Sequence, residues 1–349
     1  MLHDMENKST PDLIQGFIDE KLGSPERESK FGFHVIQGFN FNKAEWFMKY
    51  VLGWRPRHPG KALTFGSTIH ACREFWYKHG LPNGMSPEEL KKVFVGIHNG
   101  SAGAYENPSD FNDDAQRGLL MLDSWAEATV NDLARFEIIE IEKIHNFELA
   151  NGFPMTIKLD DLRRDRDSGL WIIGEAKTTS WSIDQMFNSV EVKDQSTQYI
   201  LGISRVLDLD PDRIFVMPDI MYSRGKQARS SRPGLIGRSA NELKLYEAET
   251  IGLMMDLYTR IKAWRSGIMP GILFPRNGDA WALFGSIYAK IPRDAWGLAR
   301  PDAIPEPPEG FEVDPRVRDG LIDEFIETWE RTQRDQTLEG GFQWMTTPN

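Results

Sequence analysis

The stretches Ile157-Lys158-Leu159-Asp160-Asp161 and Trp171-Ile172-Ile173-Gly174-Glu175-Ala176-Lys177 decide the fold of this chain. Each begins with an apolar run that reaches an acid, and the second run is short and continuous, as in a central strand. Strands in adjacent positions of one sheet can bring Asp160 and Glu175 together, and Lys177 shares the strand face of Glu175. The two acids therefore form a candidate site for a divalent cation.

The segments on either side of these stretches predict a mixed sheet. Residues 136–149 and 153–162 alternate apolar and polar side chains around a turn at Asn151-Gly152, which is typical of a β-hairpin. Helical spacing returns after Ser180 and lasts to Leu207, and a further strand follows at 214–217. The order of helix, three strands, helix and strand predicts an α/β fold (α+β mixed) in which helices flank a central mixed sheet.

The remaining segments suggest three parts. Residues 1–30 are polar and predict a mobile arm with one or two helical turns. Residues 31–290 form the main domain, in which a helical subdomain is inserted at about 81–134. Residues 291–349 form a proline-rich linker and a last amphipathic helix.

Composition limits the class of protein. The 349 residues carry a formal net charge of -11, from 41 Lys and Arg against 52 Asp and Glu, which argues against a generally basic surface that coats nucleic acid. The single cysteine, Cys72, excludes an intrachain disulfide and suits a reducing cytoplasm. There is no signal peptide pattern and no apolar run that would span a membrane. We therefore expect a soluble cytoplasmic protein without a membrane partner.

Three further groups of residues are candidates for a site. His70 and Glu74 lie four residues apart on a predicted helix and so share a face, although a lone His is more often structural. Gln195 and Tyr199 share a face of a later helix. The segment 222–238 is basic, and it is either a grip for phosphates or a solvated loop; its cations are Arg224, Lys226, Arg229, Arg232 and Arg238.

Together, these motifs resemble the PD-(D/E)XK nuclease superfamily. The acid that ends one strand, the acid-x-Lys of the next and the Gln-x-x-x-Tyr of 195–199 are preceded by Gly-x-x-x-His at 66–70. All four, in this order, resemble the RecB-type branch, which includes the nuclease domain of RecB, CRISPR-associated exonucleases and phage exonucleases. The resemblance covers roughly residues 35–290.

The resemblance implies a role for each motif. Asp160 and Glu175 would bind Mg²⁺ or Mn²⁺, with His70 as a further ligand and Glu74 as a candidate ligand through water. Lys177 would orient or deprotonate the attacking water, and Gln195 and Tyr199 would position Lys177 and contact DNA. Only one of Asp160 and Asp161 can face the site. Asp160 is preferred because, as in the family, it follows an apolar residue.

One departure concerns the iron–sulfur cluster that many relatives hold. The corresponding stretches 39–50 and 274–292 contain no cysteine, so no cluster is expected, and Trp46, Trp281, Phe284 and Tyr288 would replace it by apolar packing. The leading hypothesis is a metal-dependent deoxyribonuclease, most simply an exonuclease acting on single-stranded or duplex DNA ends in recombination or repair, with or without a protein partner. The alternative is an accessory protein that binds nucleic acid and cleaves little or none. The oligomeric state is left open.

Overall fold

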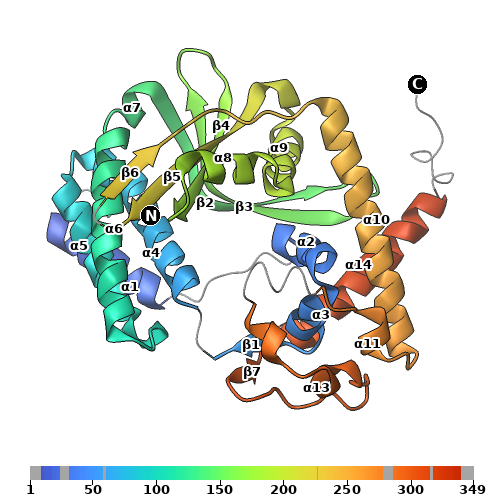
Figure 1. Ribbon diagram of the computed structural model, residues 1–349. Coiled ribbons are helices and arrows are strands. Elements are labelled where there is room, and N and C mark those ends of the chain that lie inside the picture. The colour runs from blue at the N-terminus through green and yellow to red at the C-terminus, as the bar shows by residue number, and fades with distance from the viewer. Residues whose placement is uncertain are drawn as a thin grey trace. The chain divides into compact units, whose positions relative to one another are not determined.

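The computed structural model describes residues 9–23, 31–57, 60–225, 227–277, 286–314 and 317–338 (Figure 1). The chain forms two compact units, and each unit collects three separate stretches. The first takes described residues from 1–28, 58–145 and 158–240, and the second takes those from 29–57, 146–157 and 241–349. The division expected near residues 30 and 290 stays a prediction.

A five-stranded mixed sheet carries the candidate site residues. Its strands, in their order along the chain and across the sheet, are β2 (Phe136–Glu148), β3 (Pro154–Asp165), β4 (Trp171–Thr179), β5 (Ile214–Arg224) and β6 (Gln227–Ser231). Strand β4 is antiparallel to β3 and parallel to β5, and β6 runs back along β5. Helices flank this sheet, so the fold expected from the sequence is confirmed (Figure 1).

One face of β4 and β5 packs against a layer of helices. Ala176 of β4 and Met221 of β5 belong to one apolar core with side chains from α1 (Thr10–Gly23), α4 (Lys61–Phe75), α5 (Pro87–Gly100) and α6 (Pro108–Thr129). Helices α5 and α6 lie in the segment where the sequence predicts a helical insertion. The short elements of this region are η2 (Trp76–Gly80), η3 (Leu81–Asn83), η4 (Ala102–Ala104) and α7 (Asp132–Arg135).

Helix α1 lies in the stretch that we expected to be a mobile arm. Its side chains Ile14, Phe17 and Ile18 are buried. Ile18 lies directly over Gly96 of α5, where an added Cβ would come within 2.3 Å of the isoleucine side chain. The short apolar patch of α1 is therefore covered by α5, a partner distant in sequence that local composition could not indicate.

The other face of β4 carries Glu175 and Lys177, because successive side chains of a strand point to opposite faces. On this side, helix α8 (Ile183–Glu191) contacts β4 and β5, and α9 (Asp194–Leu207) contacts β5 (Figure 1). Helix α8 begins with a capping box, in which Ser182 and Gln185 each accept a hydrogen bond from the other's backbone N–H. The short helix η5 (Pro211–Arg213) then leads into β5.

The second unit is mainly helical. It contains α2 (Phe33–Phe41), α3 (Lys43–Trp46), η1 (Phe47–Val51), α10 (Ala240–Arg265), α11 (Pro270–Leu273), η6 (Ile287–Lys290), α13 (Arg293–Gly297), η7 (Val317–Leu321), α14 (Ile322–Leu338) and a small antiparallel sheet of β1 (Trp54–Pro56) and β7 (Phe311–Val313). No helix among the described residues is both long enough and apolar enough to cross a membrane.

Aromatic rings join the early and late stretches of this second unit. The ring of Phe274 lies 4.6 Å from that of Phe47 and 6.4 Å from that of Trp46, and the Tyr288 hydroxyl donates to the Trp54 carbonyl at 2.7 Å. Phe47, Trp46, Phe274 and Tyr288 lie in the stretches 39–50 and 274–292, in which the resemblance implied that a cluster would be replaced by apolar packing. Trp281 and Phe284, which we expected in the same packing, lie outside the described residues. The contacts support the expectation that apolar packing holds these stretches together.

Candidate active site

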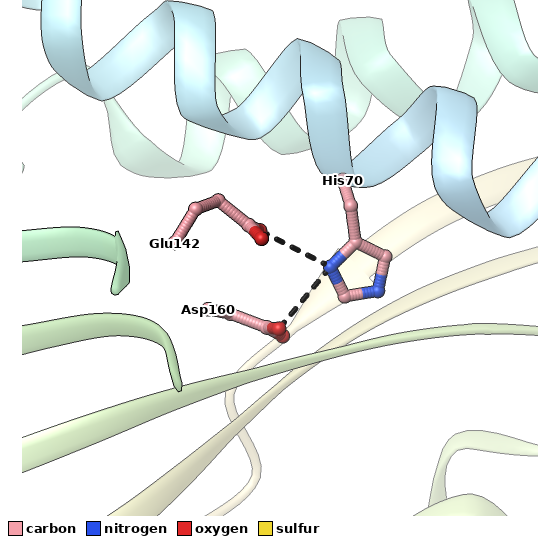
Figure 2. Close-up of side chains that lie close together, drawn as sticks. All are labelled: His70, Glu142 and Asp160. Carbon is pink, nitrogen blue, oxygen red and sulfur yellow. Dashed lines mark ion pairs between the residues drawn. The ribbon is translucent and has the colours of Figure 1, made fainter. Parts of the chain in front are cut away.

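Three side chains from separate elements of the first unit converge at one point (Figure 2). His70 comes from α4, Glu142 from β2 and Asp160 from β3, and their nearest donor atoms all lie within 4.8 Å of one another. The His70 Nδ1 atom is 3.2 Å from Asp160 Oδ1 and 3.6 Å from Glu142 Oε1. One ring nitrogen and two carboxylates therefore point into the same space.

The position of His70 follows from the packing of α4. Phe65, Ile69 and Cys72 recur at helical spacing, and all three are buried in the core. Their burial fixes the rotation of the helix, so that His70, next to Ile69, lies at the rim of the buried face and keeps about a third of its side chain exposed. Burial disfavours the charged ring, but the Asp160 and Glu142 carboxylates outweigh it and raise the pKa of His70 to about 9.

Asp160 is the centre of this group. Its Oδ2 accepts a hydrogen bond from the Ala176 N–H of β4 at 2.7 Å, and the Arg73 guanidinium lies 3.5 Å away. Burial alone would raise the pKa of the Asp160 carboxyl, but His70, Arg73 and Lys177 hold it well below its usual range. Asp160 is therefore a charged oxygen donor at neutral pH.

Asp161 faces the other side of the sheet, as the strand period requires. It is buried, and its Oδ2 accepts from Arg73 at 2.9 Å and from Arg163 at 2.8 Å. Both carboxylate oxygens are held by guanidinium groups, since Arg163 Nε also pairs with Oδ1. Of the two adjacent acids, it is Asp160 that the structure brings to His70.

A buried ion network extends from Asp161 beneath the site. It joins the cations Arg73, Arg163 and Arg232 to the anions Asp132, Asp161 and Asp219. Arg73 alone reaches both Asp219, at 3.4 Å, and Asp160, at 3.5 Å. Arg73 therefore links the network to the candidate site, where its positive charge stabilises the Asp160 carboxylate.

Glu175 and Lys177 form an ion pair beside Asp160, on the shared strand face that their spacing predicts. Burial disfavours the Lys177 ammonium, yet Glu175 and Asp160 outweigh it and raise the pKa of Lys177. The second oxygen of Glu175, Oε2, is buried and has no hydrogen-bond partner among the described residues. A buried carboxylate oxygen without a donor is costly unless a cation or water meets it.

Gln195 and Tyr199 meet on α9, where the Gln195 amide donates to the Tyr199 hydroxyl at 2.8 Å. Tyr199 is buried. Its burial, and then the charges of Glu175 and Asp160, raise the pKa of Tyr199 well above its ordinary value. The hydroxyl thus stays protonated near these carboxylates and can donate a hydrogen bond.

Glu74 lies apart from the three converging side chains. Its two oxygens pair with Lys21 of α1 and Lys78, each at 2.6 Å, and the residue is buried. The burial alone would raise the pKa of Glu74, but the two ammonium groups lower it. The visible role of Glu74 is to join α1 to α4.

The expected basic loop is a hairpin of β5 and β6, in which Tyr222 pairs with Arg229. Arg232 belongs to the buried network, where it pairs with Asp132 at 2.7 Å, and Arg238 donates to Thr197 of α9 at 2.9 Å. These two arginines have internal partners, which neither alternative for the segment, a phosphate grip or a solvated loop, anticipated. Arg224 and Arg229 are exposed, and Lys226 lies outside the described residues.

Comparison with known proteins decides the family. A family model for the PD-(D/E)XK nuclease superfamily matches residues 33–261, about two thirds of the chain. The chain belongs to the PD-(D/E)XK nuclease superfamily. No curated protein matches the sequence significantly.

PD-(D/E)XK nucleases use divalent metals, and the spacing of His70, Glu142 and Asp160 is suitable for binding such an ion. Two donors at about 2.1 Å from an ion, at right angles, lie about 3 Å apart, close to the 3.2 Å and 3.6 Å between His70 and the two acids. The unpartnered Oε2 of Glu175 is a further hard oxygen donor nearby in the sheet. His70, Glu142 and Asp160 are thus the residues that would hold the metal, with Glu175 beside them.

Glu142 is the member of this PD-(D/E)XK site that the sequence did not predict. Its φ of 52° lies in the left-handed region, which is rare for a residue other than glycine inside a strand. The alternation of buried side chains along β2 changes phase at Glu142. Before it the buried residue is even-numbered, Phe136, and after it the buried residues are odd-numbered, His145 and Phe147. Such a shift is typical of a β-bulge, and it turns Glu142 toward His70 against the alternation that a regular strand predicts.

Proposed function

We propose that this PD-(D/E)XK protein is a metal-dependent deoxyribonuclease of the RecB-type branch, acting as an exonuclease in DNA recombination or repair in the cytoplasm. The observation that carries the proposal is the convergence of His70, Glu142 and Asp160 beside the Glu175–Lys177 pair. The order of motifs, from Gly66–His70 to Gln195–Tyr199, supports the RecB-type assignment.

The side chains divide the chemistry of phosphodiester hydrolysis among them. A divalent cation held by the acids and His70 would neutralise charge on the phosphate and lower the pKa of the attacking water. One ring nitrogen among the ligands favours Mn²⁺ over Mg²⁺.

Lys177 is charged at neutral pH because Glu175 and Asp160 stabilise its ammonium form and raise its pKa. Its ammonium is therefore suited to orient the water and to donate to the negative charge that develops on phosphate oxygens. Tyr199, held by Gln195, offers a second hydrogen-bond donor on the same side of the sheet. Asp160 accepts the Ala176 N–H, which fixes its carboxylate while the other donors assemble around it.

The direct test uses the full chain and end-labelled DNA with Mg²⁺ or Mn²⁺. Lys177→Ala and Asp160→Asn should each abolish cleavage and leave the circular dichroism spectrum unchanged. Lys143→Ala is the matched control, because Lys143 is an exposed lysine of β2 that forms an ion pair with Glu140, outside the site. Substrates labelled at either end, single- or double-stranded, reveal polarity and strand preference.

The outcomes separate the candidate functions. Cleavage that survives both substitutions refutes the site assignment. Binding of DNA without cleavage by the wild-type chain, in any divalent metal, refutes the nuclease activity and favours the accessory protein that binds nucleic acid. Internal cuts in circular DNA would change the assignment from exonuclease to endonuclease.

A further inference from the structure

An open hollow lies beyond the end of β4, past Lys177. It has a volume of about 470 Å³ and is lined by Ser180, Trp181, Ser182, Gln185, Tyr222, Arg224 and Arg229. This volume is within the range of about 300–1,000 Å³ that small ligands occupy in proteins. A second hollow, lined by Trp181, Gln185 and Asn188, shares the tryptophan.

Trp181 has an exposed indole on a backbone that is held by hydrogen bonds. The residue is 55% exposed, whereas the other tryptophans in the described ranges are buried or half-buried. Its backbone N–H donates to Thr179 Oγ1 at 2.9 Å, and Ser182, the next residue, closes the capping box of α8. An exposed indole on a fixed backbone, at the wall of a hollow, offers an apolar face on which a planar ligand can stack.

The same hollow is positively charged in a chain whose net charge is -11. Its lining includes two arginines and no acid. Arg229 lies over the Tyr222 ring at 5.4 Å, which keeps its guanidinium at the wall. Arg224 is exposed, and no ion pair or hydrogen bond of its side chain appears among the described residues. Both guanidinium groups are thus available to an anion.

The strand register places this hollow next to the candidate active site. Lys177 pairs with Ile220, and two residues further along, Thr179 pairs with Tyr222, which in turn pairs with Arg229. Two residues of a parallel strand span roughly 7 Å. Thr179 points to the same face as Lys177, because residues two apart on a strand share a face, and Tyr222 shares that face because it pairs with Thr179. A chain of nucleotides bound at Lys177 would reach the hollow with a neighbouring nucleotide.

We propose that this hollow binds an unpaired nucleotide of single-stranded DNA, with the base stacked on Trp181 and a phosphate bound by Arg224 and Arg229. The proposal rests on the proposed nuclease function and specifies its substrate. In a duplex, the faces of the bases are covered by their neighbours and only the edges are open in the grooves. An exposed indole face next to two guanidinium groups is instead a combination that binds single strands, by stacking on the base and pairing with the phosphate.

The test measures binding rather than cleavage, so that it does not depend on catalysis. Fluorescence anisotropy of the full chain in EDTA compares a labelled oligothymidylate with a blunt duplex. Trp181→Ala should weaken binding of the single strand roughly tenfold and leave duplex binding unchanged, whereas Trp181→Phe should keep most of the affinity. An abasic residue scanned along the oligothymidylate should weaken wild-type binding at one position and have no effect there on Trp181→Ala.

The arginines are tested by salt dependence. Arg224→Ala and Arg229→Ala should each reduce the slope of log affinity against log salt by about 0.7, the value for one phosphate contact to a single strand. Arg213→Ala is the matched control, because Arg213 is an exposed arginine just before the opposite end of β5, and it should leave the slope unchanged.

Two results would overturn the proposal. One is an unchanged affinity of Trp181→Ala for the single strand, which would show that Trp181 does not bind DNA. The other is an equal loss for single strand and duplex, which would indicate a general effect on folding or charge. A wild-type chain that stacks DNA on Trp181 but never cleaves it in Mg²⁺ or Mn²⁺ would refute the proposed function and support the binding site.

Discussion

The carboxylate of Asp161 occupies the space in which a side chain at Gly174 would begin. A Cβ atom added to Gly174 would lie 2.3 Å from both Asp161 oxygens, closer than any real contact. The two residues pair across β3 and β4, and each is the neighbour of a candidate site acid, Asp160 or Glu175. The absence of a side chain at Gly174 thus allows the buried carboxylate to lie flat against β4.

Gly174→Ala should therefore lower the free energy of unfolding by about 1–3 kcal/mol, as overpacking of a buried site does. Because Asp161 must shift, we also expect reduced cleavage of DNA. Gly252→Ala in α10 is the control: nothing lies within 4 Å of its added Cβ, so it should be neutral or slightly stabilising. Denaturant titration of both variants measures the difference, and equal stabilities would show that Asp161 can move freely.

Arg73 should be the most costly single residue of the ion network. Its removal leaves Asp161 and Asp219 with less compensation in a buried place, for which a loss of about 3–5 kcal/mol is typical. Arg135→Ala removes an ion pair with Asp165. Because the Arg135 side chain is mostly exposed, this should lower the free energy of unfolding by less than about 1 kcal/mol. Urea unfolding of Arg73→Met and Arg135→Ala compares them, and a loss for Arg73→Met as small as that for Arg135→Ala would contradict the role of Arg73.

Two substitutions of Glu142 separate the effect of its backbone strain on stability from the effect of its carboxylate on metal binding. Glycine adopts its positive φ without the penalty of about 1–2 kcal/mol that other residues incur there. Glu142→Gly should therefore be about 1 kcal/mol more stable than Glu142→Gln, which keeps the strain and also lacks the charge. Both variants should lose at least roughly tenfold in affinity for Mn²⁺, since both lack the carboxylate ligand.

Thermal denaturation and calorimetric Mn²⁺ titration measure the two effects of the Glu142 substitutions. Equal stabilities of the glycine and glutamine variants would show that the backbone at 142 is not strained. Wild-type Mn²⁺ affinity in both variants would remove Glu142 from the metal site.

The pKa of His70 predicts how pH affects the protein without metal. It is raised from 6.5 to about 9, so the charged ring stabilises the fold fully below about pH 6.5, and this contribution is lost as pH rises through 9. Thermal denaturation in EDTA should show this decline, and His70→Gln should lack it. A decline of the same size in both proteins would assign it to another group.

Bound metal should remove this decline, because the folded ring is then neutral throughout the range. Binding requires the neutral ring, so protons compete with the ion at low pH. The rise in melting temperature on adding Mn²⁺ should therefore grow between about pH 6.5 and 9. A metal effect that does not change with pH would show that His70 is not a ligand.

The sequence predicted the parts of the site that depend on local periodicity. The strand period of two places Glu175 and Lys177 together and separates Asp160 from Asp161, and the helix period places Gln195 beside Tyr199. The fold class followed from the same patterns. These features need only the geometry of a single strand or helix, which is why composition and spacing were sufficient.

The features that escaped prediction depend on irregular backbone or on distant partners. Glu142 faces the site only because the strand changes phase at that residue. Arg232 joins Asp132 and Asp219, which lie far from it in sequence, so its basic surroundings suggested solvent or phosphate instead. Strand β6 is hidden in a run of Ser, Arg and Gly residues that lacks apolar alternation.

The path of the chain through its two units has a consequence for how the protein can be dissected or recombined. The backbone passes from one unit to the other five times, between residues 28 and 241. No single cut can therefore yield two fragments that each hold one whole unit. The catalytic half cannot be transferred as one continuous cassette, and a deletion series from either terminus removes pieces of both units before it isolates either.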